Sequence, residues 1–150
     1  MKCFKILTVC AAIAMPLCSA AAQEAEPAAA DASASSGMLV ELNKAEQTDG
    51  GCHYFLLLRN GTDYDFEVLR LDLYFFDTGG VISKRLLVGT PPVASGDTRV
   101  AAFVATEVDC DGVSQILVNN VDPCEVSQGE APACHELLEL GNRTEVNFFK

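Results

Sequence analysis

Apolar and polar residues alternate along most of the chain beyond its first quarter. In the segment Leu69–Phe75 every odd position is apolar, while Arg70 and Asp72 lie between them. This period of two is typical of a strand that buries one face. The turn Thr78–Gly80 and the segment Val81–Val88, which is apolar at both ends, follow. We therefore expect a β-hairpin here, at the centre of a β-sheet.

Further segments have the composition of short strands and are separated by turns rich in Gly, Pro and Asn. They are Met38–Asn43, Cys52–Arg59, Thr98–Thr106, Val113–Val121, Leu137–Leu140 and Glu145–Phe149. Cys52–Arg59 is apolar on both faces, which predicts an interior strand. Val113–Val121 also fits a helical period, but its short length and its cluster Ile116–Val118 favour a strand.

Two irregularities in the pattern indicate how the strands are shaped and connected. The apolar positions change parity between Phe66 and Leu69, which predicts a β-bulge near Val68. The segment Gly89–Asp97 contains Pro-Pro and Gly-Asp steps and is expected to cross between sheets. About seven short strands without a long helix predict an all-β fold, an antiparallel immunoglobulin-like β-sandwich.

The first 37 residues do not share this pattern. Residues 1–22 have two lysines, an apolar run and the small residues Ala20 and Ala22 before Gln23, which is the form of a cleaved secretory signal peptide. The run is too short for a membrane span, and we expect no stable membrane anchor. Residues 23–37 lack large apolar side chains and are predicted to be a disordered tail. Residues 38–150 would then form one domain.

Acidic residues dominate the charged positions. The formal net charge is −11, and loss of Lys2 and Lys5 with the leader leaves 8 basic against 21 acidic residues, or −13. A surface this acidic repels phosphate backbones and anionic headgroups, so we expect no nucleic acid as a partner.

Four cysteines remain once the leader and its three cysteines are removed. An even number in a small exported domain predicts disulfides, and three pairings are possible. We favour Cys52 with Cys110, which ties an early strand to the segment before Val113, and Cys124 with Cys134, which closes a short polar loop. Two such bonds suit a periplasmic or extracellular protein.

An alternative interpretation is zinc or copper binding, because His53 and His135 each directly follow a cysteine. Neighbouring residues on a strand point to opposite faces, however, so neither Cys-His pair can easily serve one ion. The chain also has no nucleophile elbow, phosphate-binding loop or dinucleotide-binding glycine pattern. We therefore predict a protein that is not an enzyme and has no cofactor, with metal binding as the alternative.

Several motifs within Leu39–Lys150 occur together. They are Leu42–Glu46 with Gly51-Cys52, Asn60–Thr62, Leu71–Leu73 with Phe76-Asp77 and Gly80–Ile82, and Cys110-Asp111 before Ile116–Val121 and Cys124. In this combination the chain resembles a family of small exported alphaproteobacterial proteins known as Tat pathway signal sequence domain proteins. The resemblance implies a periplasmic domain and provides no catalytic residues. Because Lys2–Lys5 contains no twin arginine, we expect the general secretion route instead.

The hairpin, the Pro-rich loop and the Gly-Asp-Thr step also look like small immunoglobulin-like modules of bacterial envelopes. Tyr74 and Phe76 lie on the strand face opposite the buried odd positions. Either another element covers them, which we favour, or they form a small exposed aromatic patch. We therefore expect an accessory module that contacts another envelope protein through a sheet edge or the Tyr74/Phe76 face.

Overall fold

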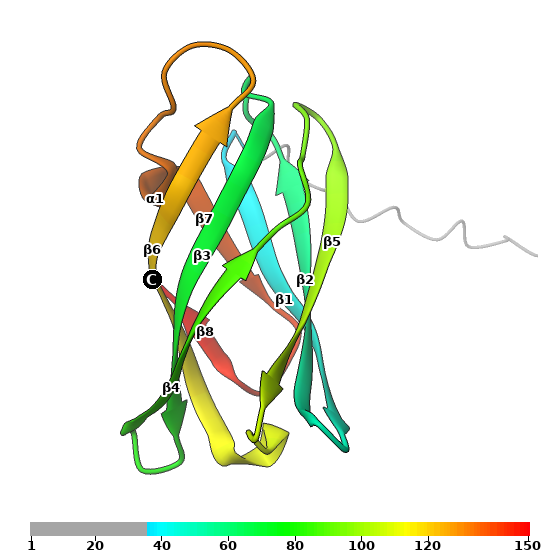
Figure 1. Cartoon of the computed structure of the whole chain (residues 1–150), viewed down its shortest axis with the longest axis vertical. Helices are drawn as coiled ribbons and strands as arrows, with labels where there is room; N and C mark the ends of the chain where they lie inside the picture. The colour runs from blue at the N-terminus through cyan, green and yellow to red at the C-terminus, as the bar shows by residue number, and fades with distance from the viewer. Residues whose placement is uncertain (1–35) are drawn as a thin grey trace, which may run out of the picture. The chain divides into compact units, whose positions relative to one another are not determined.

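The computed structural model of this chain describes residues 36–150, so the predicted signal peptide and nearly all of the predicted tail lie outside the described residues. Within residues 36–150, eight strands, one short 3-10 helix and one single-turn α-helix are formed (Figure 1). The strands are β1 (Met38–Thr48), β2 (Gly51–Asn60), β3 (Phe66–Asp77), β4 (Ile82–Gly89), β5 (Thr98–Thr106), β6 (Val113–Val126), β7 (Leu138–Asn142) and β8 (Asn147–Phe149). The helices are η1 (Cys110–Gly112) and α1 (Cys134–Leu137).

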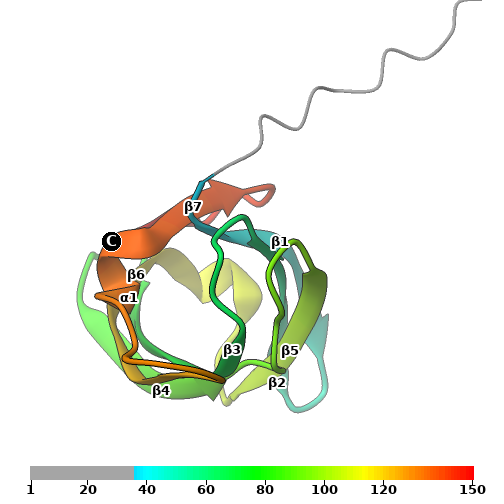
Figure 2. The same ribbon diagram turned by 90° about the horizontal axis from the view of Figure 1, so that it is seen from above.

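The strands form two four-stranded sheets, in the orders β5-β2-β1-β7 and β4-β3-β6-β8. Seen from above, the two sheets face each other across a common interior (Figure 2). The predicted β-sandwich is therefore confirmed at the level of two packed β-layers, and β2 is an interior strand as expected. The loop between β4 and β5 crosses from one sheet to the other, also as expected.

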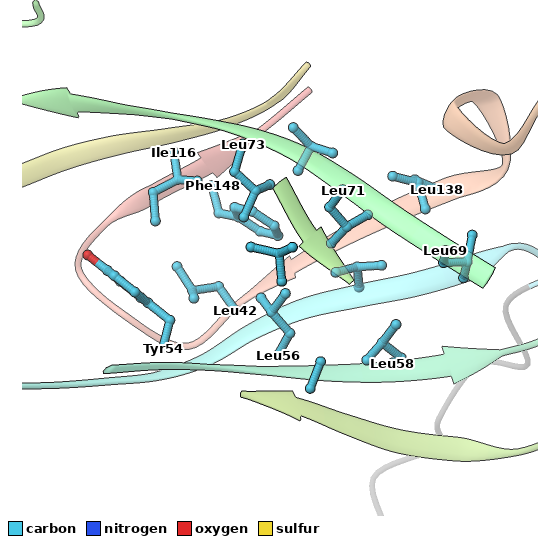
Figure 3. Close-up of a cluster of buried hydrophobic side chains, with 14 of the residues drawn as sticks. Leu42, Tyr54, Leu56, Leu58, Leu69, Leu71, Leu73, Ile116, Leu138 and Phe148 are labelled. Carbon is cyan, nitrogen blue, oxygen red and sulfur yellow. The ribbon is translucent and has the colours of Figure 1, made fainter. Parts of the chain in front are cut away.

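Strand alternation builds the core. Tyr54, Leu56 and Leu58 of β2 are buried, whereas the residues between them are half-buried on the outer face. Leu71 and Leu73 of β3 point toward them from the facing sheet (Figure 3). Burial also raises the pKa of Tyr54 to about 12, so this phenol stays neutral in the core.

The predicted parity change in β3 is present. The register of β3 against β6 shifts between Phe66 and Val68, so Phe66 and Leu69 are both buried although one is even and one is odd. The predicted central position of the whole hairpin is wrong, however, because β4 lies at the edge of its sheet. Beyond β4 no further strand of residues 36–150 pairs in that sheet, since β5 joins the opposite one.

The prediction of purely antiparallel sheets is wrong as well. β7 runs parallel to β1, and β8 runs parallel to β6. β7 and β8 follow each other in the chain but belong to different sheets. β7 lies beside β1 and β8 beside β6, and each runs in the same direction as its neighbour. Apolar alternation reports which face of a strand is buried but not the direction of its neighbour, so the sequence pattern gives no sign of this.

Val113–Val121 is a strand, as the sequence favours, and continues to Val126. The predicted strand at Leu137–Leu140 begins one residue later, because Cys134–Leu137 forms α1. Gly37, the last residue of the predicted tail, is buried in the folded domain, and its carbonyl accepts a hydrogen bond from the Gly61 amide.

Asn60 ends β2 and holds the turn that follows it. Its Oδ1 accepts hydrogen bonds from the amide and the hydroxyl of Thr62, at 3.0 and 2.7 Å. Its Nδ2 donates to the carbonyl oxygens of Tyr64 and Val93, at 2.7 and 3.1 Å. The side chain is 1% exposed, and these four bonds use its two donors and both acceptor sites.

Asn142 makes a similar turn after β7 but on the surface. Its Oδ1 accepts from the amide and hydroxyl of Thr144, and its Nδ2 donates to the Val146 carbonyl. The two positions differ mainly in exposure, because Asn142 is exposed and Asn60 is not.

We expect Asn60→Ala to lower the free energy of unfolding by about 1–3 kcal/mol, because it leaves the buried Thr62 amide without its hydrogen-bond acceptor. Asn142→Ala should cost less, since water can replace the lost bonds at an exposed turn. Urea unfolding of the two variants and the unchanged protein measures both effects. An equal or larger loss for Asn142→Ala would contradict this account of the buried turn.

Candidate functional site

The outer face of the sheet β4-β3-β6-β8 carries aromatic residues. Because Leu73 and Phe75 face the core, Tyr74 and Phe76 point outward. Phe76 packs against Phe149 of β8, with ring centroids 6.3 Å apart. Both predicted partner-surface residues are half-buried, so they are covered in part by side chains of their own sheet.

Two apolar side chains next to these aromatics are largely exposed. Ile82 pairs with Phe76 across β4 and β3, and Leu87 pairs with Asp72. Residues that are directly opposite each other on paired strands share a face. Ile82 and Leu87 are each 55% exposed. We call the surface formed by Tyr74, Phe76, Ile82, Leu87 and Phe149 the aromatic face.

A buried carboxylate lies beside the aromatic face. Asp72 is only 6% exposed, and Arg85 donates to both of its oxygens, from Nε at 2.7 Å and from Nη2 at 3.1 Å. Asn119 donates from Nδ2 to Oδ2 at 3.0 Å. The Arg85 guanidinium also lies over the Tyr74 ring, 5.4 Å from its centroid. These contacts join β3, β4 and β6 and fix the arginine next to the aromatics.

Sequence reasoning identified Tyr74 and Phe76 but missed Arg85 and Asn119. The sequence did contain one sign that Asp72 has polar partners, namely its position between two leucines of a strand. A carboxylate in such a position needs hydrogen-bond partners. The identity of those partners depends on strand register, which the sequence pattern does not give.

Arg85 is the main cause of the low pKa of Asp72, which lies below its ordinary value of 3.8 because the arginine donates hydrogen bonds to the carboxylate. Burial opposes this effect, and the bond from Asn119 adds to it. A carboxylate whose folded-state pKa is lowered stabilises the fold above its unfolded-state pKa. That contribution is lost as the pH falls through the folded-state value.

We therefore expect Asp72→Asn to be less stable than the unchanged protein near neutral pH, with the difference narrowing as the pH falls below 3.8. The measurement is the urea midpoint of both proteins across the acid range. Asp63→Asn, at an exposed position, is the control and should follow the unchanged protein. A constant difference between Asp72→Asn and the unchanged protein at every pH would contradict the assignment.

The four cysteines form the two predicted disulfides. Cys52 is bonded to Cys110 and Cys124 to Cys134, with sequence separations of 58 and 10 residues. Their sulfurs are therefore not available as thiolate ligands or nucleophiles. Two disulfides in so small a domain indicate an oxidising compartment, as found for exported proteins.

We expect the two disulfides to contribute unequally to stability. In the chain-entropy model, replacing both Cys52 and Cys110 by Ala costs about 4 kcal/mol, and replacing Cys124 and Cys134 costs about 3 kcal/mol, because the closed loops differ in length. Each pair contains one buried cysteine, so the loss of packing is comparable. Urea unfolding of the two double variants tests the order, and a larger loss for the Cys124/Cys134 variant would reverse it.

The two histidines of the metal-binding alternative have separate local partners. The His53 ring on the outer face of β2 packs against Phe55, with centroids 4.3 Å apart. His135 in α1 places Nε2 3.1 Å from the Val118 carbonyl oxygen of β6. In the described part of the chain, no group of three or more His, Cys, Asp or Glu residues could hold a metal ion.

Comparison with known proteins gives no relative: no family model, curated protein or solved structure matches this chain. None of the helices within residues 36–150 is long and apolar enough to cross a membrane.

Proposed function

We propose that this protein is a non-enzymatic interaction module of the bacterial cell envelope, exported to the periplasm by the general secretion route. The observation that carries the proposal is the aromatic face, with exposed Ile82 and Leu87 beside an arginine that is already fixed in place. Two facing sheets, a loop that crosses between them and two disulfides support an immunoglobulin-like sandwich as its framework.

The composition of this face suits a protein partner. Aromatic residues and arginine are enriched in the centres of protein interfaces, and they provide most of the residues whose truncation weakens binding strongly. Arg85 is held by two hydrogen bonds to Asp72, so little side-chain freedom remains to be lost on binding.

The distribution of charge over the molecule indicates which kind of protein could bind the aromatic face. The chain as a whole carries −11, but Arg70 and Arg85 lie on the outer face of β3 and β4, and the Asp72 charge is paired. An acidic protein would be repelled by most of this molecule and least by this face. The proposed partner is therefore an envelope protein that presents an apolar patch bordered by acidic side chains.

The test is capture of a partner from solubilised membranes of the source organism by the immobilised, disulfide-intact protein. The double variant Ile82→Ser/Leu87→Ser should capture at least about tenfold less, because a loss of 1.4 kcal/mol in binding already has that effect. Val100→Ser is the matched control, since Val100 is 58% exposed on the other sheet. Capture that is equal for both variants, or no protein above background, would refute the proposal.

A further inference from the structure

The strand β5 is a long sheet edge without the usual protection. It pairs with β2 on one side, and no strand of residues 36–150 pairs with its other side. Its nine residues contain one charge, Arg99, and no proline. Its register against β2 has no bulge. Natural proteins usually blunt such an edge with charges, prolines, bulges or short strands, because an open edge pairs with other chains.

The remaining edges have that protection. β4 contains Lys84 and Arg85 and has a register shift at its start. β7 and β8 have five and three residues. Lys150 also donates from Nζ to the carbonyl oxygen of Leu138 at the start of β7. The lack of protection at β5 is therefore a local feature and not a property of the whole fold.

The backbone groups of β5 that face away from β2 can be identified from the two ends of the ladder. The Asn60 amide donates to the Asp97 carbonyl at 2.9 Å, and the Glu107 amide donates to the Gly50 carbonyl at 3.4 Å. In an antiparallel pair, alternate residues bond to the partner strand, so odd residues of β5 bond to β2. The even residues Val100, Ala102 and Val104 direct their N–H and C=O groups outward.

Lys84 contacts the last of these outward backbone groups. Its Nζ donates to the carbonyl oxygen of Thr106, an even residue, which agrees with the outward direction of the even backbone groups. The side chains of the even residues lie on the outer face, where Val100 is 58% and Val104 is 40% exposed. The even positions read Thr98, Val100, Ala102, Val104 and Thr106, which is a symmetric series about Ala102.

We infer that β5 pairs with β5 of a second copy of this chain, antiparallel and centred on Ala102. A twofold axis at this residue places Val100 opposite Val104 of the other copy and Thr98 opposite Thr106, so one surface complements itself. The three central pairs would form about six backbone hydrogen bonds, two for each bonded pair. The two sheets that contain β2 would become one continuous sheet.

The charges of the strand agree with this pairing. In the centred register Arg99 lies opposite Ala105, so the charge of one copy does not meet its equivalent in the other. Like charges directly opposite each other destabilise a strand pair, and none occurs within these nine residues. The net charge of −11 on each copy opposes association at long range, and salt screens that repulsion. We therefore expect the dimer to become tighter as the salt concentration rises.

The first test uses Ala102→Pro in the disulfide-intact protein. Proline removes an outward N–H that β2 does not use and is tolerated on the open side of an edge strand. Ala102→Thr keeps the N–H and is the matched control. Sedimentation over a concentration series should show a monomer–dimer equilibrium for the unchanged protein and Ala102→Thr. Association of Ala102→Pro should be at least about tenfold weaker, because both hydrogen bonds of the central pair are lost.

The second test reads the register and does not depend on how well Ala102→Pro folds. Across a bonded antiparallel pair the Cα atoms are about 5.5 Å apart, within the range that a disulfide can bridge. Ala102→Cys should therefore give a covalent dimer on oxidation. Thr98→Cys is the control, because the two copies of residue 98 would lie about 27 Å apart along the paired strands.

A monomer at all concentrations and salt levels, or equal cross-linking of the two cysteine variants, would overturn the inference. Association that Ala102→Pro leaves unchanged would overturn it too, because another surface would then be responsible. The inference is independent of the proposed function. Ile82→Ser/Leu87→Ser should dimerise normally, and Ala102→Pro should retain capture through the aromatic face, so failure of either idea is distinguishable from failure of the other.

Discussion

Three aromatic rings pack together between the two sheets, of which Tyr54 and Phe75 are fully buried and Phe103 is half-buried against the core. Tyr54 and Phe103 belong to β2 and β5 of one sheet, and Phe75 belongs to β3 of the other. The ring centroids of Tyr54 and Phe75 are 5.6 Å apart, and those of Phe75 and Phe103 are 6.4 Å apart. Large rings bury more area per residue than other side chains. Their inward positions also fix which residues point outward, since side chains alternate along each strand.

Asp72 also determines the register of β3, from the outer face of the sheet. A slip of β3 by one residue would place its carboxylate in the core and expose the apolar residues on either side. In the native register Asp72 meets Arg85 from β4 and Asn119 from β6, so three strands must be aligned for the carboxylate to be satisfied. The network therefore opposes misaligned pairings, and it holds the arginine beside Tyr74 at the same time.

Apolar alternation was enough to predict most strands, the bulge near Val68 and the outward direction of Tyr74, because burial of one face dictates that pattern. The even number of cysteines left after the predicted leader indicated two disulfides, and the positions of these cysteines favoured the pairing that is present. The sequence pattern does not show which strands lie next to each other, because strand pairing depends on the three-dimensional path of the chain. The partners of Asp72, the parallel pairing of β7 with β1 and the open edge of β5 were missed for this reason.

Net charge and edge chemistry act together in this fold. An excess of carboxylates keeps copies of the chain apart over most orientations, because long-range repulsion does not depend on register. Backbone hydrogen bonds act only at contact, and only where the strands are aligned. β5 combines open backbone groups with a single charge that self-pairing keeps away from its equivalent. The net charge that opposes association in general therefore leaves this strand, with one charge and a symmetric series of outward residues, as the place where two copies can meet at least cost.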